Sequence, residues 1–88
     1  MIRRRLTVHG LVQGVGFRYS LARQARTRGV GGSAANRPDG TVEIVLEGEP
    51  EAVEALVRWC EHGPRGAVVE RVAVTDEPPE GLQHFRTG

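Results

Sequence analysis

Lysine is absent from this sequence and cysteine occurs once, and each shortage excludes a kind of site. Without lysine there is no P-loop, because that loop requires a Gly-Lys-Ser/Thr segment. Cys60 on its own forms neither an intramolecular disulfide nor a cysteine-based metal site, and a lone free cysteine is typical of the reducing cytoplasm. Long apolar runs are absent too, so we expect no signal peptide and no membrane span.

The net charge is small and aromatic residues are few, and both features argue against a nucleic acid as a partner. The 88 residues include 12 basic and 11 acidic side chains, and the net charge is only +1. Aromatic residues make up 5% of the chain and are not paired on the expected central strands, as RNA-binding sheets require. We therefore interpret the basic cluster Arg3–Arg5 as the solvated start of a strand rather than as a nucleic-acid arm.

What the sequence does contain suits a small globular protein, and we expect a single domain over residues 1–88. Hydrophobic residues make up 39% of the chain and charged residues 26%. Alternating apolar residues predict a half-buried strand over residues 4–9. Apolar residues at helical spacing predict a helix over residues 17–28, which Gly29 ends.

A hairpin is predicted in the middle of the chain. Residues 30–36 and 41–47 are expected to be strands, and the segment Asn36-Arg37-Pro38-Asp39-Gly40 between them has the composition of a tight turn. The first strand is rich in glycine and alanine, which are poor strand formers. Its prediction therefore depends on the turn and on the clear strand that follows.

The last third of the chain predicts a helix and two strands. A proline after an acidic residue opens the helix, and its apolar residues recur at helical spacing up to Cys60. Residues 67–75 are rich in valine and predict a strand, with a bulge near Glu70 because the apolar residues change phase there. A Pro-rich loop over residues 76–81 then leads to a short final strand over residues 82–86 at the sheet edge.

The predicted order β-α-β-β-α-β, with a late extra strand, defines the fold class. Two split βαβ units of this kind form the ferredoxin-like α+β sandwich. We therefore expect one mostly antiparallel sheet, two helices on one of its faces and a short extra edge strand.

The segment His9–Arg18, between the first strand and the first helix, is the main candidate site. It contains glycines that permit unusual backbone conformations and a close approach to a ligand: Gly10, Gly14 and Gly16. Backbone N–H groups in such a loop can converge on an anion, and the start of the helix adds to the positive field. Arg18 supplies a planar fork of donors that matches phosphate oxygens. We predict an anion site for phosphate; the alternative is a plain turn with a solvated arginine.

Two segments resemble the motifs of one enzyme family. Val8–Arg18 resembles the signature of the acylphosphatase family, and Gly29–Glu43 looks like its second motif. The spacing between the two also fits, and the resemblance covers essentially the whole chain.

The resemblance implies hydrolysis of the carboxyl–phosphate bond of a small acyl phosphate, without a metal, a cofactor or a covalent intermediate. It assigns Arg18 as the catalytic arginine and Asn36 as the asparagine that positions the attacking water. The phosphate cradle corresponds to the backbone N–H groups of six residues: Gln13, Gly14, Val15, Gly16, Phe17 and Arg18. We expect a monomer whose site can hold a phosphate or sulfate ion.

One departure from the family pattern lies in the second motif. Members often carry tryptophan where this chain has Ser33, and all of residues 32–35 are small. We expect looser packing of this strand, which bears on the placement of Asn36 and on substrate preference.

Other polar side chains are interpreted as structural. No paired carboxylate or metal-ligand spacing accompanies any histidine, so all three are expected to be structural or solvated: His9, His62 and His84. Asp39 is assigned to the turn, and Glu43 and Glu47 to the outward face of their strand. Asn36 has a second interpretation as a residue that merely starts the turn.

Three apolar or aromatic side chains are assigned to packing. Cys60 is expected to be buried and inert. Trp59 and Tyr19 are interpreted as packing residues rather than as a platform for a ligand.

Two alternatives to an enzyme stay open from the residues. The first is a ferredoxin-like module that binds phosphate or another anion without turning it over, since fold does not decide function. The second is the acylphosphatase-like module of a carbamoyl-transfer maturation protein, which continues into zinc-binding cysteine motifs. A non-catalytic module would need Arg18 but not the amide of Asn36, so the presence of both favours the enzyme.

Overall fold

The sheet has one covered face and one open face, and the alternating burial of side chains along its first strand reflects this. The computed structural model of the chain describes every residue from Met1 to Gly88, and its first strand, β1, spans Ile2–Leu11. Leu6 and Val8 are fully buried, whereas Thr7 between them is only half-buried on the opposite face. This is the period-two pattern that the sequence predicts for the strand.

Five strands and two helices follow one another in the predicted order. After β1 come these elements: α1 (Phe17–Thr27), β2 (Gly31–Asn36), β3 (Val42–Gly48), α2 (Pro50–Cys60), β4 (Val68–Glu77) and β5 (Phe85–Thr87). The strands form one sheet in the order β4-β1-β3-β2-β5, and only β2 and β5 pair in parallel. The ferredoxin-like α+β fold, with a short extra strand at one edge, is therefore confirmed.

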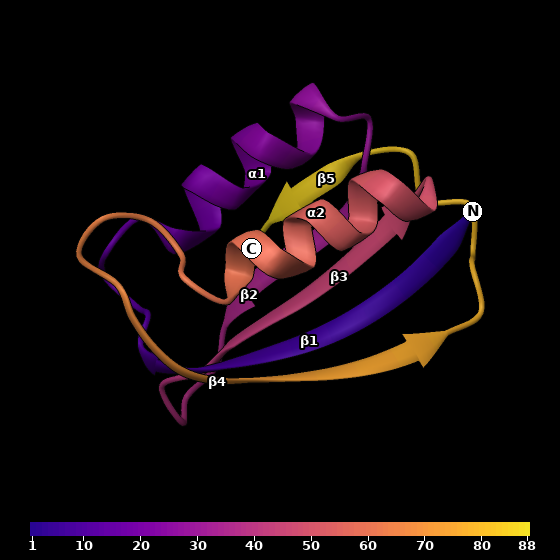
Figure 1. Cartoon of the computed structure of the whole chain (residues 1–88). Helices are drawn as coiled ribbons and strands as arrows, with labels where there is room; N and C mark the ends of the chain where they lie inside the picture. The colour runs from indigo at the N-terminus through magenta and orange to yellow at the C-terminus, as the bar shows by residue number, and fades with distance from the viewer.

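Both helices cover the same face of the sheet (Figure 1). α1 packs on β2 and β5, α2 packs on β1 and β3, and the two helices contact each other. One hydrophobic cluster fills the space between helices and sheet. Cys60 is fully buried in it, and burial raises the pKa of its thiol to about 12, so the thiol stays protonated and unreactive as predicted. Neither helix is long and apolar enough to cross a membrane.

Of the last two strands, β4 ends later than predicted and β5 begins later than predicted. β4 continues to Glu77 because Glu77 pairs with Arg3 in the ladder between β4 and β1. β5 begins at Phe85 rather than at Leu82. The cause is a tertiary contact: the backbone N–H of Leu82 donates to the carboxylate of Glu47 at 2.9 Å instead of pairing with a strand.

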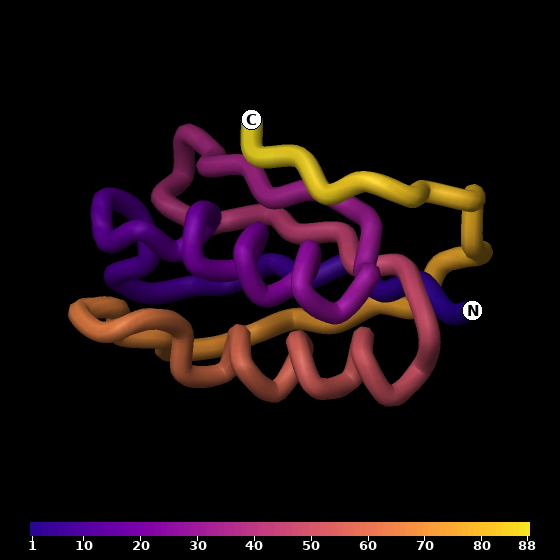
Figure 2. The backbone as a smooth tube through the Cα atoms, turned by 90° about the horizontal axis from the view of Figure 1, so that it is seen from above, coloured from indigo at the N-terminus to yellow at the C-terminus, as the bar shows by residue number.

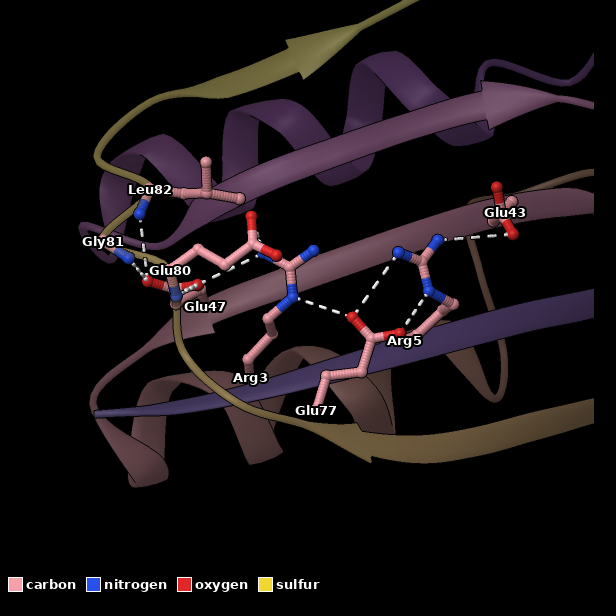
Figure 3. A network of polar contacts seen from close by, with 8 residues as sticks. All are labelled: Arg3, Arg5, Glu43, Glu47, Glu77, Glu80, Gly81 and Leu82. Carbon is pink, nitrogen blue, oxygen red and sulfur yellow. Dashed lines mark hydrogen bonds and ion pairs between the residues drawn. The ribbon is translucent and has the colours of Figure 1, made fainter.

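A network of ion pairs crosses the open face of the sheet (Figure 3). Arg3 is only 6% exposed, and its guanidinium donates to Glu77 at 2.8 Å and to Glu47 at 3.3 Å. Arg5 binds the same Glu77 carboxylate and lies 3.4 Å from Glu43. The prediction of a solvated basic cluster is therefore wrong for Arg3, because strand pairing places an acidic residue directly beside it on each side.

Glu47 faces outward from the sheet as predicted, yet it is 1% exposed. The segment from Glu80 to Leu82 covers it, and the backbone N–H groups of Glu80, Gly81 and Leu82 all donate to its carboxylate, at 2.9, 2.6 and 2.9 Å. Burial alone would raise the pKa of this carboxyl. The three N–H groups and Arg3 outweigh burial and hold the pKa below its ordinary value.

The two glycines of β2 allow close packing, so the expected looser packing does not apply at Gly31 and Gly32. A Cβ atom at Gly31 would lie 2.4 Å from the carbonyl oxygen of Leu82, and one at Gly32 would lie 1.8 Å from that of Val45. Gly32 also has a φ of +138°, which other residues rarely adopt. Backbone therefore packs directly against backbone on both sides of the strand that ends at Asn36.

Candidate active site

The loop after β1 and the turn after β2 meet at one end of the sheet. β1 and β3 are antiparallel, with Val8 opposite Val42, and Asn36 at the end of β2 also pairs with Val42. Both connections consequently leave the sheet at the same end. Figures 1 and 2 show this end opposite the N-terminus, with loop 12–16 and hairpin turn 37–41 close together in both views.

A small cavity of about 170 Å³ lies between this loop and the end of β2. Arg18 and Asn36, the two predicted catalytic residues, both line it. The complete lining is Val12, Gly14, Gly16, Phe17, Arg18, Tyr19 and Asn36. At about 30 Å³ per water molecule the cavity has room for a phosphoryl group and a water, but for little more.

Gly10 belongs to a bulge and not to this cavity, which corrects its assignment to the anion loop. The register between β1 and β4 shifts at Gly10, which lies opposite Val69, and Glu70 is the extra residue on β4. A Cβ atom at Gly10 would lie 2.0 Å from the carbonyl oxygen of Val68. The glycine thus lets the two strands approach each other, and the predicted bulge near Glu70 is confirmed.

The loop and the first turn of α1 carry a run of free backbone donors. Gly14 and Gly16 have φ angles of +74° and +77°, so the chain turns sharply before the helix starts at Phe17. No backbone N–H group from residues 13–19 donates to a backbone carbonyl; the first to do so is that of Ser20, to Gly16 at 3.0 Å. Free N–H groups of this kind at a helix start favour an anion.

Arg18 is half-buried, yet its guanidinium has no hydrogen-bond or ion-pair partner in the protein. The remaining arginines without a partner are all exposed at the surface: Arg23, Arg28, Arg58, Arg65 and Arg86. A half-buried cation facing a cavity with its donors free is suited to an anionic ligand with two oxygen atoms in one plane.

The side chain of Asn36 is also without a partner, although the turn beside it is fully bonded. Asp39 serves that turn, as predicted: its carboxylate accepts the N–H of Thr41 at 3.0 Å and the hydroxyl of Thr41 at 2.6 Å. Both hydrogen bonds lower the pKa of Asp39, and the bond from the hydroxyl of Thr41 has the larger effect. Because Asp39 and Thr41 close the turn, the carboxamide of Asn36 is left free at the cavity.

Phe17 anchors the start of α1 and thereby the position of Arg18. Its ring is 2% exposed and meets the ring of Trp59 edge-on, with centroids 5.3 Å apart. The packing role predicted for Trp59 is confirmed. The same prediction is wrong for Tyr19, which is 72% exposed at the rim of the cavity. Helical spacing alone did not separate the two aromatic residues, since each lies near the border of an apolar stripe.

Histidines contribute nothing to this cavity. The Nε2 atom of His9 lies 3.1 Å from the guanidinium of Arg71, and His62 and His84 are exposed. None of the three lines the cavity. No group of three or more His, Cys, Asp or Glu side chains is arranged to hold a metal ion, so we assign no metal centre.

The acylphosphatase family model matches residues 4–87 of this chain. An acylphosphatase from Thermococcus kodakarensis is 55% identical over 85 residues, which cover 97% of this chain and 93% of the relative. The crystal structure of acylphosphatase from Bacillus subtilis superposes with a TM-score of 0.95 at 37% identity, over 100% of this chain and 99% of that one. T. kodakarensis HypF matches at 32% identity and a TM-score of 0.85, with this chain covering 12% of it.

The fold and the matched motifs define a small ferredoxin-like phosphohydrolase. More particularly, the chain belongs to the acylphosphatase family, whose members hydrolyse acyl phosphates.

Proposed function

We propose that this acylphosphatase binds the phosphoryl group of its substrate with Arg18 and the backbone N–H groups of residues 13–18, and that Asn36 holds the attacking water. The observation that carries the proposal is the shared cavity. The guanidinium of Arg18, which is half-buried and unpaired, and the free carboxamide of Asn36 both line this cavity. The free backbone N–H groups of the loop lie beside them.

Phosphate binding follows from the distribution of charge. Three non-bridging oxygens carry the negative charge of the phosphoryl group, and that charge stays spread over them as the bond to the leaving group breaks. Arg18 offers two parallel donors and the loop offers several N–H groups, all held by the fold before substrate arrives. Preorganised donors of this kind stabilise the transition state without having to reorient during the reaction.

Asn36 suits the placing of a water because its carboxamide both donates and accepts hydrogen bonds. The water oxygen forms a bond to phosphorus, and the bond from phosphorus to the acyl oxygen breaks, releasing a carboxylate. An amide does not take up a proton, and no carboxylate or imidazole lines the cavity. The proton of the water therefore passes to an oxygen of the substrate phosphate, and the contribution of Asn36 is orientation.

The size of the cavity suggests how little of the substrate is enclosed. At about 170 Å³ it lies below the roughly 300–1,000 Å³ of pockets that bury a whole drug-sized ligand. The phosphoryl group and the water fill it, so the acyl group extends past the exposed ring of Tyr19 into solvent. This geometry favours many acyl groups over one.

Turnover of acetyl phosphate in the presence of a chelator tests the proposal. We expect Arg18→Ala and Asn36→Ala each to lower kcat/KM by about 100-fold, the usual loss for one preorganised transition-state contact. Arg23→Ala, an exposed and unpaired arginine on the same helix, is the matched control and should retain full activity. Phosphate binding without turnover in the native protein would instead support the anion-binding module.

We also propose that residues 1–88 act as one domain, as a monomer and in the cytoplasm. All elements share one hydrophobic cluster, which supports a single domain. Cys60 is a free thiol, which suits a compartment where thiols stay reduced. Sedimentation of the protein at several concentrations tests the monomer directly.

A further inference from the structure

The side chain of Gln13 spans the gap between the phosphate loop and the hairpin turn. Its Nε2 atom donates to the carbonyl oxygen of Arg37 at 2.8 Å and to that of Thr41 at 3.0 Å. Both protons of the carboxamide nitrogen are thereby used. Gln13 does not line the cavity, so its side chain is directed at the hairpin rather than at the substrate.

The two carbonyl groups that Gln13 binds close the turn directly after Asn36. The N–H of Arg37 donates to the carbonyl of Thr41 at 2.9 Å, and the N–H of Gly40 donates to the carbonyl of Arg37 at 3.1 Å. An ion pair from Arg37 to Glu43 at 2.8 Å adds a further tie. The turn is thus a well-bonded unit with Asn36 at its base.

Loop 12–16 is a separate unit that otherwise lacks bonds to this turn. The pairing of β1 with β3 ends at Val8 and Val42, so the two strands diverge before the loop begins. No backbone hydrogen bond joins the loop to residues 36–41. The two bonds of Gln13 are therefore the hydrogen bonds that set the distance between the phosphate cradle and the residue proposed to hold water.

We infer that Gln13 is a positioning residue, which acts through Asn36 by holding the hairpin turn against the phosphate loop. The inference depends on the function proposed above. In-line attack requires the water to lie within a narrow range of the phosphorus atom, and a displacement of about 1 Å can lower the rate about 100-fold. Binding of phosphate depends on the loop and Arg18 alone, so loss of the link should affect turnover and spare phosphate affinity.

Gln13→Met is the most direct test, because methionine matches glutamine in length and donates no hydrogen bond. We expect kcat for acetyl phosphate to fall at least about 10-fold, with the inhibition constant of inorganic phosphate little changed. Gln13→Glu, equally long and again without the donors, should also lose kcat. Gln83→Met is the matched control, since Gln83 is exposed, its side chain makes no hydrogen bond, and it lies away from the cavity.

A double-mutant cycle with Asn36→Ala separates positioning from a general structural role. If Gln13 acts through Asn36, Gln13→Met should add little to the loss of kcat caused by Asn36→Ala. Losses that multiply, or a loss of phosphate affinity that matches the loss of kcat, would overturn the inference. Full kcat in Gln13→Met beside an impaired Asn36→Ala overturns the inference alone. Full kcat in Asn36→Ala overturns the proposed function and the inference together.

Discussion

Arg18 differs from the other arginines of this protein in what surrounds it. Arg3 and Arg5 are tied into ion pairs, and the other arginines without partners lie exposed in water. Arg18 alone is half-buried with free donors, beside a loop whose N–H groups are also free. These donors are not fully buried, so they remain accessible to an anionic ligand, which can accept charge-assisted hydrogen bonds from them.

Arg18→Lys tests whether the planar fork matters or only the charge. Lysine places one point charge where arginine offers two parallel donors, so we expect kcat/KM to fall about 100-fold although the charge is retained. Steady-state turnover of acetyl phosphate measures this, with Arg23→Lys on the same helix as the control. Wild-type turnover in Arg18→Lys would show that a single positive charge is sufficient.

At the scale of elements, the small residues of β2 fix the position of the strand that ends at Asn36, the residue proposed to hold the attacking water. Gly31 and Gly32 let the backbones of Leu82 and Val45 approach closer than a side chain would permit. The strand is thus held between β3 and the chain that leads into β5. This packing fixes the end of β2, where Asn36 meets the cavity.

Gly32→Ala should destabilise the fold strongly. The added Cβ atom would lie 1.8 Å from the carbonyl of Val45, and the φ of +138° is unfavourable for alanine. Overpacking and backbone strain together predict a loss of about 3 kcal/mol in the free energy of unfolding, measured by urea denaturation. Gly40→Ala is the control, because its φ is +92° but nothing lies within 4 Å, so it should show the backbone strain alone. Equal losses in both variants would contradict the close approach.

At the scale of the whole molecule, an ionic network joins segments far apart in the sequence. Arg3 on β1 donates hydrogen bonds to Glu47 on β3 and to Glu77 on β4. The carboxylate of Glu47 also accepts hydrogen bonds from the backbone N–H groups of Glu80–Leu82. The pKa values of Glu77 and Glu47 are both lowered: Arg5 and Arg3 lower the first, and hydrogen bonds overcome burial in the second. The network therefore makes folding depend on pH.

Glu47→Gln should weaken the fold at neutral pH and flatten its acid sensitivity. A carboxyl with a lowered pKa stabilises the fold above the ordinary value of about 4.3, and this stabilisation is lost as pH falls through the folded-state pKa. We expect a loss of about 2–3 kcal/mol at pH 7, since Arg3 and three N–H groups lose their anion. Urea denaturation at neutral and acid pH measures it. Glu54→Gln, exposed on α2, is the control, and an unchanged acid slope in Glu47→Gln would refute the assignment.

The order of elements and the candidate site residues could be predicted from the sequence, because both depend on local patterns. Periods of two and 3.6 residues define strands and helices over a few turns. Glycines before a helix, with an arginine in its first turn, define an anion loop without reference to the rest of the chain. Arg18 followed from this local pattern, whereas the role of Asn36 followed only from the family motif, because its own neighbourhood is typical of a residue that starts a turn. The fold brings both residues to one cavity.

Only the tertiary structure decided which faces are covered and which side chains meet. Arg3 and Glu47 look like surface residues in sequence, yet they are buried together because a segment about thirty residues after Glu47 folds over the open face. Gln13 reaches a turn 24 residues away for the same reason. Burial and side-chain pairing depend on distant segments that pack against a residue, and local periodicity carries no information about them.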